Sequence, residues 1–137
     1  MTDATGSGEL TTEDRRELTE LLARYAWAFD TRDGEAYAAL FTEDGMLQGP
    51  RTTIAGRDAL RDWAANYDLT ISRHISSNVV IEGDATQATV KSYLMSWTID
   101  EDGIKPPLLG SYHDSVVKEP DGWRIAHRRL VIDHWGE

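Results

Sequence analysis

The first part of the chain carries apolar residues at helical spacing. Over residues 13–29, apolar side chains recur three or four positions apart and form one face: Leu18, Leu21, Leu22, Tyr25, Ala26 and Phe29. Thr11 or Thr12 suits the N-terminal cap, because a hydroxyl accepts hydrogen bonds from the free N–H groups of a first helical turn. Residues 36–41 and 57–67 show the same spacing in shorter form. The pattern therefore predicts three helices before Thr70.

From Thr70 onward the spacing changes to the alternation typical of strands. It predicts four long strands, and a short one precedes the third helix: 46–48, 73–82, 86–99, 108–118 and 123–134. Helices followed by strands indicate one α+β domain, in which three helices cross the concave face of a curved, mixed but mainly antiparallel sheet of about four to six strands. We expect residues 1–10 to be a flexible tail and residues 11–137 to form that domain.

Composition excludes several classes of protein. The 137 residues carry a formal net charge of −10, which argues against nucleic acid as a partner because such binding depends on many Lys and Arg contacts to phosphates. There is no cysteine, so disulfides, thiolate zinc sites and cysteine nucleophiles are excluded. The first ten residues lack the pattern of a signal peptide, and no run approaches the roughly 20 apolar residues of a membrane span. We expect a cytoplasmic protein without a membrane partner.

Four segments carry a family resemblance: LLARYAWAFDTRDGEAYAALFTEDG, RHISSN, GSYHD and DGWRIAHRR. In this order and at these separations they resemble the SnoaL-like branch of the NTF2-like superfamily, from Leu18 to about Asp133. The resemblance implies a cone-shaped barrel in which N-terminal helices pack on a strongly curved sheet around a pocket. It implies less about activity, because the fold hosts dehydratases, isomerases, cyclases, epoxide hydrolases and non-catalytic subunits.

The resemblance also implies a candidate catalytic set. In scytalone and bile-acid dehydratases, a Tyr and an Asp of the first helix region meet a His of the first long strand, and Tyr25, Asp30 and His74 match them by position. His74 would move a proton, Asp30 would orient the imidazole, and Tyr25 would polarise a carbonyl or hydroxyl group. The Asp30 and His74 side chains should then lie within about 3.2 Å or share one water. Tyr25 as a core residue and Asp30 as a turn residue are the structural alternatives.

Further residues are candidates for the pocket lining: Trp63, Asn78, Tyr112, His127 and Arg129. By alternation His127 and Arg129 share one face of the last strand, and His113 lies on the face opposite to Tyr112 and Asp114. Some dehydratases of the superfamily use two histidines, so His113 and His127 are a second possibility. The sequence leaves open which of these faces points into the cone.

No metal or organic cofactor is expected. The four histidines lack HxH or HExxH spacing, and the family usually works without either. The Arg128–Arg129 pair is interpreted as partners for carboxylates on neighbouring strands, with binding of an anionic substrate group as the alternative. Residues 46–50 have no carboxylate to act as the base of a ketosteroid isomerase. An Asp-Arg-Asp set of the epoxide hydrolase kind, built from Asp114 and Arg129, would leave His74 unexplained.

Two functions remain. The first is a cofactor-independent lyase or isomerase, of dehydratase or cyclase type, acting on a hydrophobic ring-bearing small molecule; five Trp and five Tyr supply pocket walls. The alternative is a non-catalytic binding or assembly module that resembles the small subunit of ring-hydroxylating dioxygenases. A homodimer is expected in the first case, because alternation places Tyr93, Met95 and Trp97 on a sheet face that three helices cannot cover.

Overall fold

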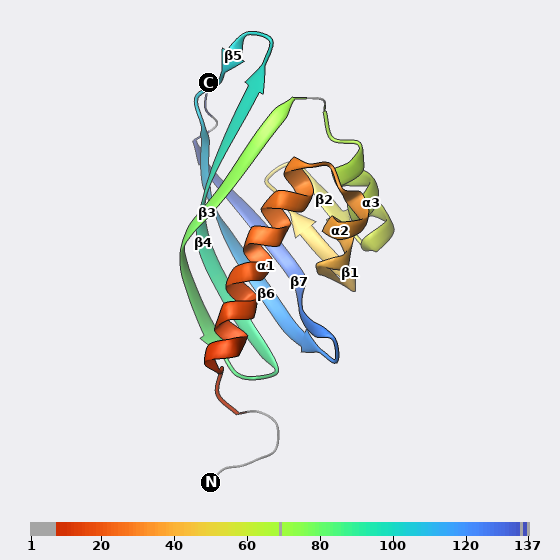
Figure 1. Cartoon of the computed structure of the whole chain (residues 1–137), viewed down its shortest axis with the longest axis vertical. Helices are drawn as coiled ribbons and strands as arrows, with labels where there is room; N and C mark the ends of the chain where they lie inside the picture. The colour runs from red at the N-terminus through yellow and green to blue at the C-terminus, as the bar shows by residue number, and fades with distance from the viewer. Residues whose placement is uncertain (1–7, 69, 135, 137) are drawn as a thin grey trace.

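A computed structural model of the chain describes residues 8–68, 70–134 and 136. Three helices lie on one side of a single curved sheet (Figure 1): α1 Thr12–Asp30, α2 Gly34–Ala39 and α3 Arg57–Ala65. The sheet has seven strands: β1 Phe41–Gln48, β2 Thr53–Ala55, β3 Ile71–Gly83, β4 Gln87–Asp100, β5 Gly103–Ile104, β6 Leu108–Glu119 and β7 Gly122–His134. No helix of the described residues is long and apolar enough to cross a membrane.

Side chains cap the first turns of α1 and α2, whereas α3 begins after Gly56 without a side-chain cap. Thr11 and Asp14 form a capping box on α1, in which each side chain bonds the backbone N–H of the other residue, at 2.9 and 3.0 Å. Asp33 caps α2 by accepting from Ala36 N–H at 3.1 Å, so this helix lies two residues earlier than the predicted 36–41. The third helix ends at Ala65, two residues before the predicted end. Residues 1–7 of the predicted tail lie outside the described residues.

The strand order is β2-β1-β7-β6-β4-β3, and β5 pairs with β4. The β1–β7 pair is parallel and the other pairs are antiparallel, as a mixed, mainly antiparallel sheet requires. The expected upper limit of six strands was wrong, because β2 and β5 are too short to produce alternation in the sequence. The sheet is strongly curved but is not closed into a barrel, since β2 and β3 remain as its two ends (Figure 1).

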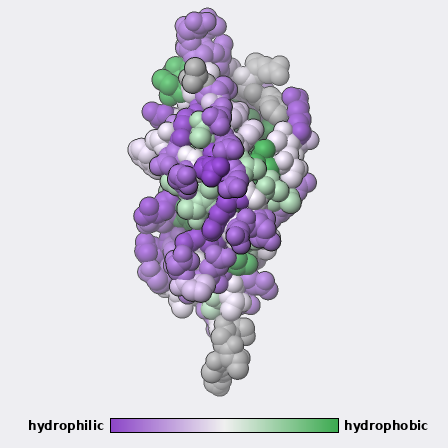
Figure 2. Space-filling model, turned by 90° about the vertical axis from the view of Figure 1, so that its right-hand side faces the viewer, coloured by the Kyte–Doolittle hydropathy of each residue, from purple (hydrophilic) through white to green (hydrophobic). Residues whose placement is uncertain are grey.

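The core fills the space between the helices and the concave face of the sheet. Its most completely buried apolar side chains come from every layer: Leu18, Tyr37, Phe41, Leu60, Val90, Val116, Trp123 and Ile125. The side of the molecule shown in Figure 2 is mostly hydrophilic. Apolar side chains are exposed on the convex sheet face instead, on three neighbouring strands, and we call them the convex patch: Ile71, Ile75, Tyr93, Met95, Ile99 and Leu109.

Asp14 fastens the start of α1 to the hairpin between β6 and β7. Its carboxylate accepts hydrogen bonds from Lys118 Nζ at 2.9 Å and Trp123 Nε1 at 3.1 Å, and the side chain is 1% exposed. Burial alone would raise the pKa of Asp14, but these bonds and those from Thr11 lower it well below its usual value. The carboxylate therefore stabilises the packing of the helix that carries the candidate site.

Asp14→Asn is expected to remove part of the acid sensitivity of the fold. Because the pKa of Asp14 is lower in the folded chain than in the unfolded chain, its stabilisation is complete above about pH 4 and declines as the pH falls toward the folded pKa. Urea unfolding at several pH values below neutrality should show that the free energy of unfolding depends less on pH in the variant than in the wild type. Asp58→Asn is the matched control, since that side chain is 93% exposed. An unchanged pH dependence for Asp14→Asn would contradict the expectation.

Candidate active site

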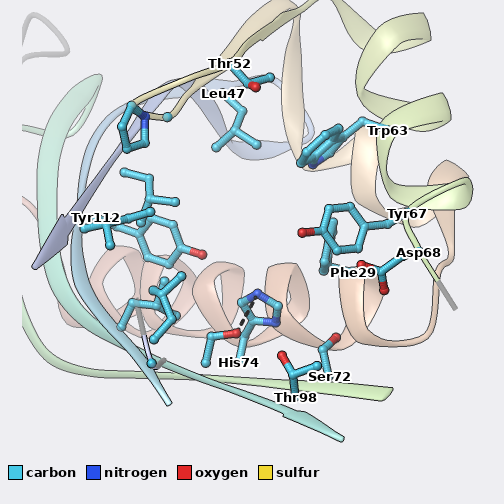
Figure 3. A pocket seen from close by; sticks show the side chains of 18 of the residues that line it. Phe29, Leu47, Thr52, Trp63, Tyr67, Asp68, Ser72, His74, Thr98 and Tyr112 are labelled. Carbon is cyan, nitrogen blue, oxygen red and sulfur yellow. Dashed lines mark hydrogen bonds between the residues drawn. The ribbon is translucent and has the colours of Figure 1, made fainter. Parts of the chain in front are cut away.

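A cavity of about 550 Å³ opens between the helices and the concave face of the sheet (Figure 3). Its walls are mainly aromatic and aliphatic: Phe29, Leu47, Ile54, Trp63, Tyr67, Leu94, Leu108, Tyr112, Leu130 and Ile132. Polar side chains also line the cavity: one group lies where β3 begins, around Ser72 and His74, and Arg51, Thr52 and Lys105 lie elsewhere on the wall. This volume and this lining are typical of sites for small organic molecules.

Asp30 and His74 form a hydrogen-bonded pair at one side of the cavity. Asp30 is the last residue of α1, and His74 is the fourth residue of β3. His74 Nδ1 lies 2.6 Å from Asp30 Oδ1, and the His74 backbone N–H donates to Asp30 Oδ2 at 2.9 Å. Burial alone would raise the pKa of Asp30, but the hydrogen bonds from the ring and backbone of His74 lower it. The side chains are only 9% and 15% exposed, so the pair is largely shielded from water.

This pairing leaves the other ring nitrogen of His74 for the cavity. Nε2 is 3.4 Å from Ser96 Oγ and points toward the cavity interior (Figure 3). A carboxylate on Nδ1 holds the tautomer in which Nδ1 carries the proton and Nε2 is free to accept one. Phe29 packs edge-on against the imidazole, with ring centroids 5.1 Å apart, and limits its rotation. The arrangement can therefore present a base with a fixed orientation.

Two residues that hold this pair were missed by the sequence analysis. Ser72 Oγ donates to Asp30 Oδ1 at 2.8 Å. Arg32 joins the end of α1 to the start of β3, because its guanidinium donates to Ser72 Oγ at 3.1 Å and to the Thr70 carbonyl at 2.7 Å. The backbone of Arg32 is left-handed, with φ of 59°, just after the helix end. The sequence predicts a turn in this segment, but its pattern does not indicate that the Arg32 side chain contacts Ser72 and Thr70.

Tyr25 lines the same cavity and does not contact the Asp30–His74 pair by hydrogen bond. Its hydroxyl lies 2.8 Å from the hydroxyl of Tyr37, which is fully buried in the core. When Tyr37 donates this hydrogen bond, the hydroxyl of Tyr25 keeps its own proton for a second acceptor. Burial raises the pKa of both phenols, so both stay protonated near neutral pH. Tyr25 is thus a core residue whose hydroxyl is hydrogen-bonded to that of Tyr37.

Two further phenols point into the cavity. The Tyr112 and Tyr67 side chains enter from opposite walls, and His74 lies between them (Figure 3). Tyr112 is a predicted pocket residue on β6, whereas Tyr67 follows α3 and was not singled out. Burial raises the pKa of each phenol, which keeps them as hydrogen-bond donors. Trp63, also predicted, packs edge-on against Tyr67 at 5.1 Å and completes the aromatic wall.

A buried ion pair lies beneath Tyr25 and Tyr112. Arg128 of β7 bonds Asp114 of β6 through two nitrogens, with Nε–Oδ1 at 2.8 Å and Nη2–Oδ2 at 3.1 Å. Both side chains are 0% exposed. The guanidinium carbon lies 4.1 Å from the ring centroid of Tyr25 and 3.5 Å from that of Tyr112. The prediction that this arginine pairs with a carboxylate on a neighbouring strand is confirmed.

The structure does not place His127 or Arg129 in the cavity. The register passes from Ser115↔His127 to Val116↔Ile125, so β7 contains one extra residue between them. This β-bulge reverses the alternation along β7. The even-numbered side chains of the later part of the strand therefore point inward, and Arg129 is exposed. The pocket interpretation based on uninterrupted alternation was wrong for these two residues.

The remaining candidates also lie outside the cavity lining. His127 Nε2 is 2.9 Å from Gln48 Oε1. Asn78 is exposed, and its left-handed backbone, with φ of 56°, lies where the β3–β4 register shifts. His113 lies opposite Arg129 in the register and contacts Ser111 Oγ at 2.9 Å, on the face away from Tyr112. Within the part of the chain that the structure describes, no three His, Asp or Glu side chains are grouped as metal ligands would be.

Comparison with known proteins agrees with this architecture. Residues 10–129 match the model of the SnoaL-like domain. The uncharacterized protein Rv2910c of Mycobacterium tuberculosis is 24% identical over 123 residues, which cover 84% of this chain and 82% of that protein. The solved structure of a variant of Rv3472, a function unknown protein from the same species, has a TM-score of 0.85 and 34% identity, and the match covers 90% of this chain and 78% of that one.

A candidate scytalone dehydratase from Novosphingobium aromaticivorans is also similar in structure. It has a TM-score of 0.76 and 27% identity, and the match covers 88% of this chain and 84% of that chain. The family model spans most of the chain, from the start of α1 to β7, and includes every residue of the Asp30–His74 site. The chain therefore belongs to the family of SnoaL-like domain proteins.

Proposed function

We propose that this protein is a cofactor-independent lyase or isomerase that acts by acid–base chemistry on a hydrophobic, ring-bearing small molecule. The observation that carries the proposal is the Asp30–His74 hydrogen bond of 2.6 Å, with the second ring nitrogen turned toward a cavity of aromatic and aliphatic walls. The similarity to a candidate scytalone dehydratase supports the same class of reaction.

The proposed reaction begins at His74. Its Nε2 takes a proton from the carbon next to a ketone carbonyl, and the electron pair of that C–H bond forms an enolate. Tyr25, or Tyr112 across the cavity, donates a hydrogen bond to the enolate oxygen. In a dehydration, the enolate expels the hydroxide at the β carbon, and the imidazolium returns its proton to form water. Asp30 stabilises the imidazolium throughout, because its carboxylate stays ionised.

The lining of the cavity indicates the class of substrate. Phe29, Trp63 and Tyr67 form one connected aromatic wall, with ring centroids 5.0 to 6.5 Å apart. Stacked and edge-on aromatic contacts favour flat ring systems. Hydrogen-bonding side chains also line the cavity, among them His74, Ser96 and Tyr112, so a ring system that carries oxygen substituents fits best.

Proton exchange in heavy water tests the proposed chemistry without knowledge of the natural substrate. A bicyclic aromatic ketone such as a tetralone should exchange its protons next to the carbonyl for deuterium in the presence of the protein, as followed by proton NMR. Cyclic β-hydroxyketones should in addition lose water and produce the ultraviolet absorption of an enone. A native mass spectrum of the purified protein would identify a retained metabolite. Exchange no faster than in buffer, across such a panel, would count against the proposal.

We also propose that the convex patch forms a homodimer interface. The six side chains of the patch lie on adjacent strands, in register: Ile75 opposite Met95 and Ile71 opposite Ile99 on β3 and β4. Tyr93, at one end of the patch, is its most exposed side chain at 61%. Contiguous exposed apolar side chains of this kind are typical of interaction surfaces.

The dimer is tested by solution mass. Small-angle scattering at micromolar protein should give twice the monomer mass, and Tyr93→Lys should reduce it to the monomer mass because a charge would be buried in the interface. Glu35→Lys is the control, since Glu35 is exposed on α2, on the helical side of the sheet. A monomeric wild-type protein would rule out the dimer. A trimer would favour the assembly module that resembles a dioxygenase small subunit.

A further inference from the structure

The charged pair beneath the cavity is unusual because its cation contacts two aromatic rings, Tyr25 and Tyr112, which pack edge-on against each other with centroids 5.8 Å apart. Arg128 is fully buried, does not line the cavity, and lies with its guanidinium carbon 4.1 Å and 3.5 Å from the ring centroids of Tyr25 and Tyr112. Both rings line the cavity. Asp114 occupies the Nε and Nη2 side of the guanidinium. The cation thus contacts two rings that line the cavity, although its own side chain does not.

The charge of this guanidinium is only partly balanced by hydrogen bonding. Asp114 accepts from Nε and Nη2, while Nη1 is buried and has no hydrogen-bond partner among the described residues. A buried ion pair often contributes little to stability compared with apolar residues of similar size. A contribution to stability is therefore a weak explanation for a buried cation at this position, beside two phenols that line the cavity.

We propose that Arg128 is a positioning residue that acts through Tyr25 and Tyr112: held by Asp114, its guanidinium fixes both rings and strengthens their hydroxyls as hydrogen-bond donors to an oxyanion in the cavity. A cation against the face of a phenol ring draws electron density from the ring and favours negative charge on its oxygen. A hydroxyl in that state donates a stronger hydrogen bond, and the low local dielectric increases the effect. The inference rests on the proposed function, because the two phenols are the oxyanion donors of the proposed reaction.

At both phenols the charge of Arg128 lowers the pKa, against burial and a neighbouring phenol that raise it more strongly. Burial is the largest cause that raises the pKa of Tyr25 and of Tyr112, and the charge of Arg128 opposes it in both cases. Asp114 acts in the opposite direction but more weakly than the arginine, which touches the rings directly. Tyr37, whose hydroxyl lies 2.8 Å from that of Tyr25, acts against the arginine and raises the pKa of Tyr25.

The two hydroxyls differ in position, since that of Tyr25 lies against the hydroxyl of Tyr37. Tyr112 extends its hydroxyl into the cavity toward the region of His74 (Figure 3). His74 would generate the enolate there, so the developing oxyanion lies between the base and the phenols. The sequence pattern shows Arg128 only as one of two adjacent arginines, and the neighbouring Arg129 is exposed on the other face of β7. That neighbour provides a control of the same residue type.

The test measures how strongly the cavity prefers an anionic oxygen, without any turnover. 4-Nitrophenol is the probe, because its phenolate absorbs visible light and the ionised fraction of the bound dye is read directly. The pH at which the bound dye ionises is compared between the wild type and Arg128→Met/Asp114→Leu, which replaces the pair with apolar residues of similar size. We expect this pH to rise by about one unit in the double variant, a roughly tenfold loss of preference for the anion. Arg129→Met should leave it unchanged.

Two further comparisons keep the test decisive. The same shift is expected in the His74→Ala background, since the phenols and not the imidazole are the donors. Tyr112→Phe and Tyr25→Phe keep the rings and remove the hydroxyls. Each should raise the ionisation pH of the bound dye if the lost hydroxyl binds the anion. These two variants replace the double variant as the test if the double variant fails to fold. An unchanged ionisation pH in the double variant, or in both Phe variants, would overturn the inference. A failure of the proposed function would appear separately, as His74→Ala with unaltered proton exchange.

Discussion

His74→Ala is expected to lower the rate of proton exchange or dehydration by roughly a hundredfold or more. In the proposed reaction the imidazole both accepts and returns a proton, and water in the vacated space would be neither oriented nor held by Asp30. Asp30→Asn should keep the shape of the site but weaken the control of the tautomer, so a smaller loss of kcat is expected. Tyr25→Phe should remove one oxyanion donor and leave the base in place.

The measurement requires matched variants with intact folds. His127→Ala removes an imidazole that lies outside the cavity lining and should retain normal turnover. Circular dichroism and unfolding curves should show that the His74 and Asp30 variants remain folded. Normal turnover by His74→Ala would reject the Asp30–His74 pair as the proton-transfer centre. A loss in His127→Ala of equal size would indicate a two-histidine mechanism instead.

Arg128→Met alone is expected to decrease the free energy of unfolding by about 3–5 kcal/mol. The substitution leaves the Asp114 carboxylate buried at 0% exposure with neither of its charged hydrogen bonds. Asp114→Leu alone should be similarly destabilising because it leaves the guanidinium unpaired. The double variant Arg128→Met/Asp114→Leu should recover most of the loss, since no charge then remains buried.

Urea unfolding of the four proteins measures this coupling directly. Arg129→Met is the control on the adjacent exposed residue, and a change of no more than about 0.5 kcal/mol is expected there. If the losses of the two single variants simply add in the double variant, the pair is not coupled as the geometry indicates. Recovered stability together with a weaker preference for the anionic dye would separate the structural contribution of the pair from its effect on the phenols.

Local patterns were sufficient for most of the fold. The face of α1, from Leu18 to Phe29, and the long alternating strands are confirmed, because their periodicity reflects burial on one face. Boundaries differed by a few residues where a cap intervened, as at Asp33. The pairing of Asp30 with His74 followed from the resemblance to known dehydratases, and the structure brings the two side chains to 2.6 Å.

The sequence by itself determined the three helices, the strand-rich second half and the positions of Tyr25, Asp30 and His74 along them. Only the tertiary structure decided which arginine of the adjacent pair is buried. The bulge in β7 depends on pairing with β6, which is not visible in the strand's own pattern, and one inserted residue exchanges the two faces of everything that follows. In the same way, Arg32 and Tyr67 reach the site because distant segments pack together, and local periodicity carries no information about such contacts.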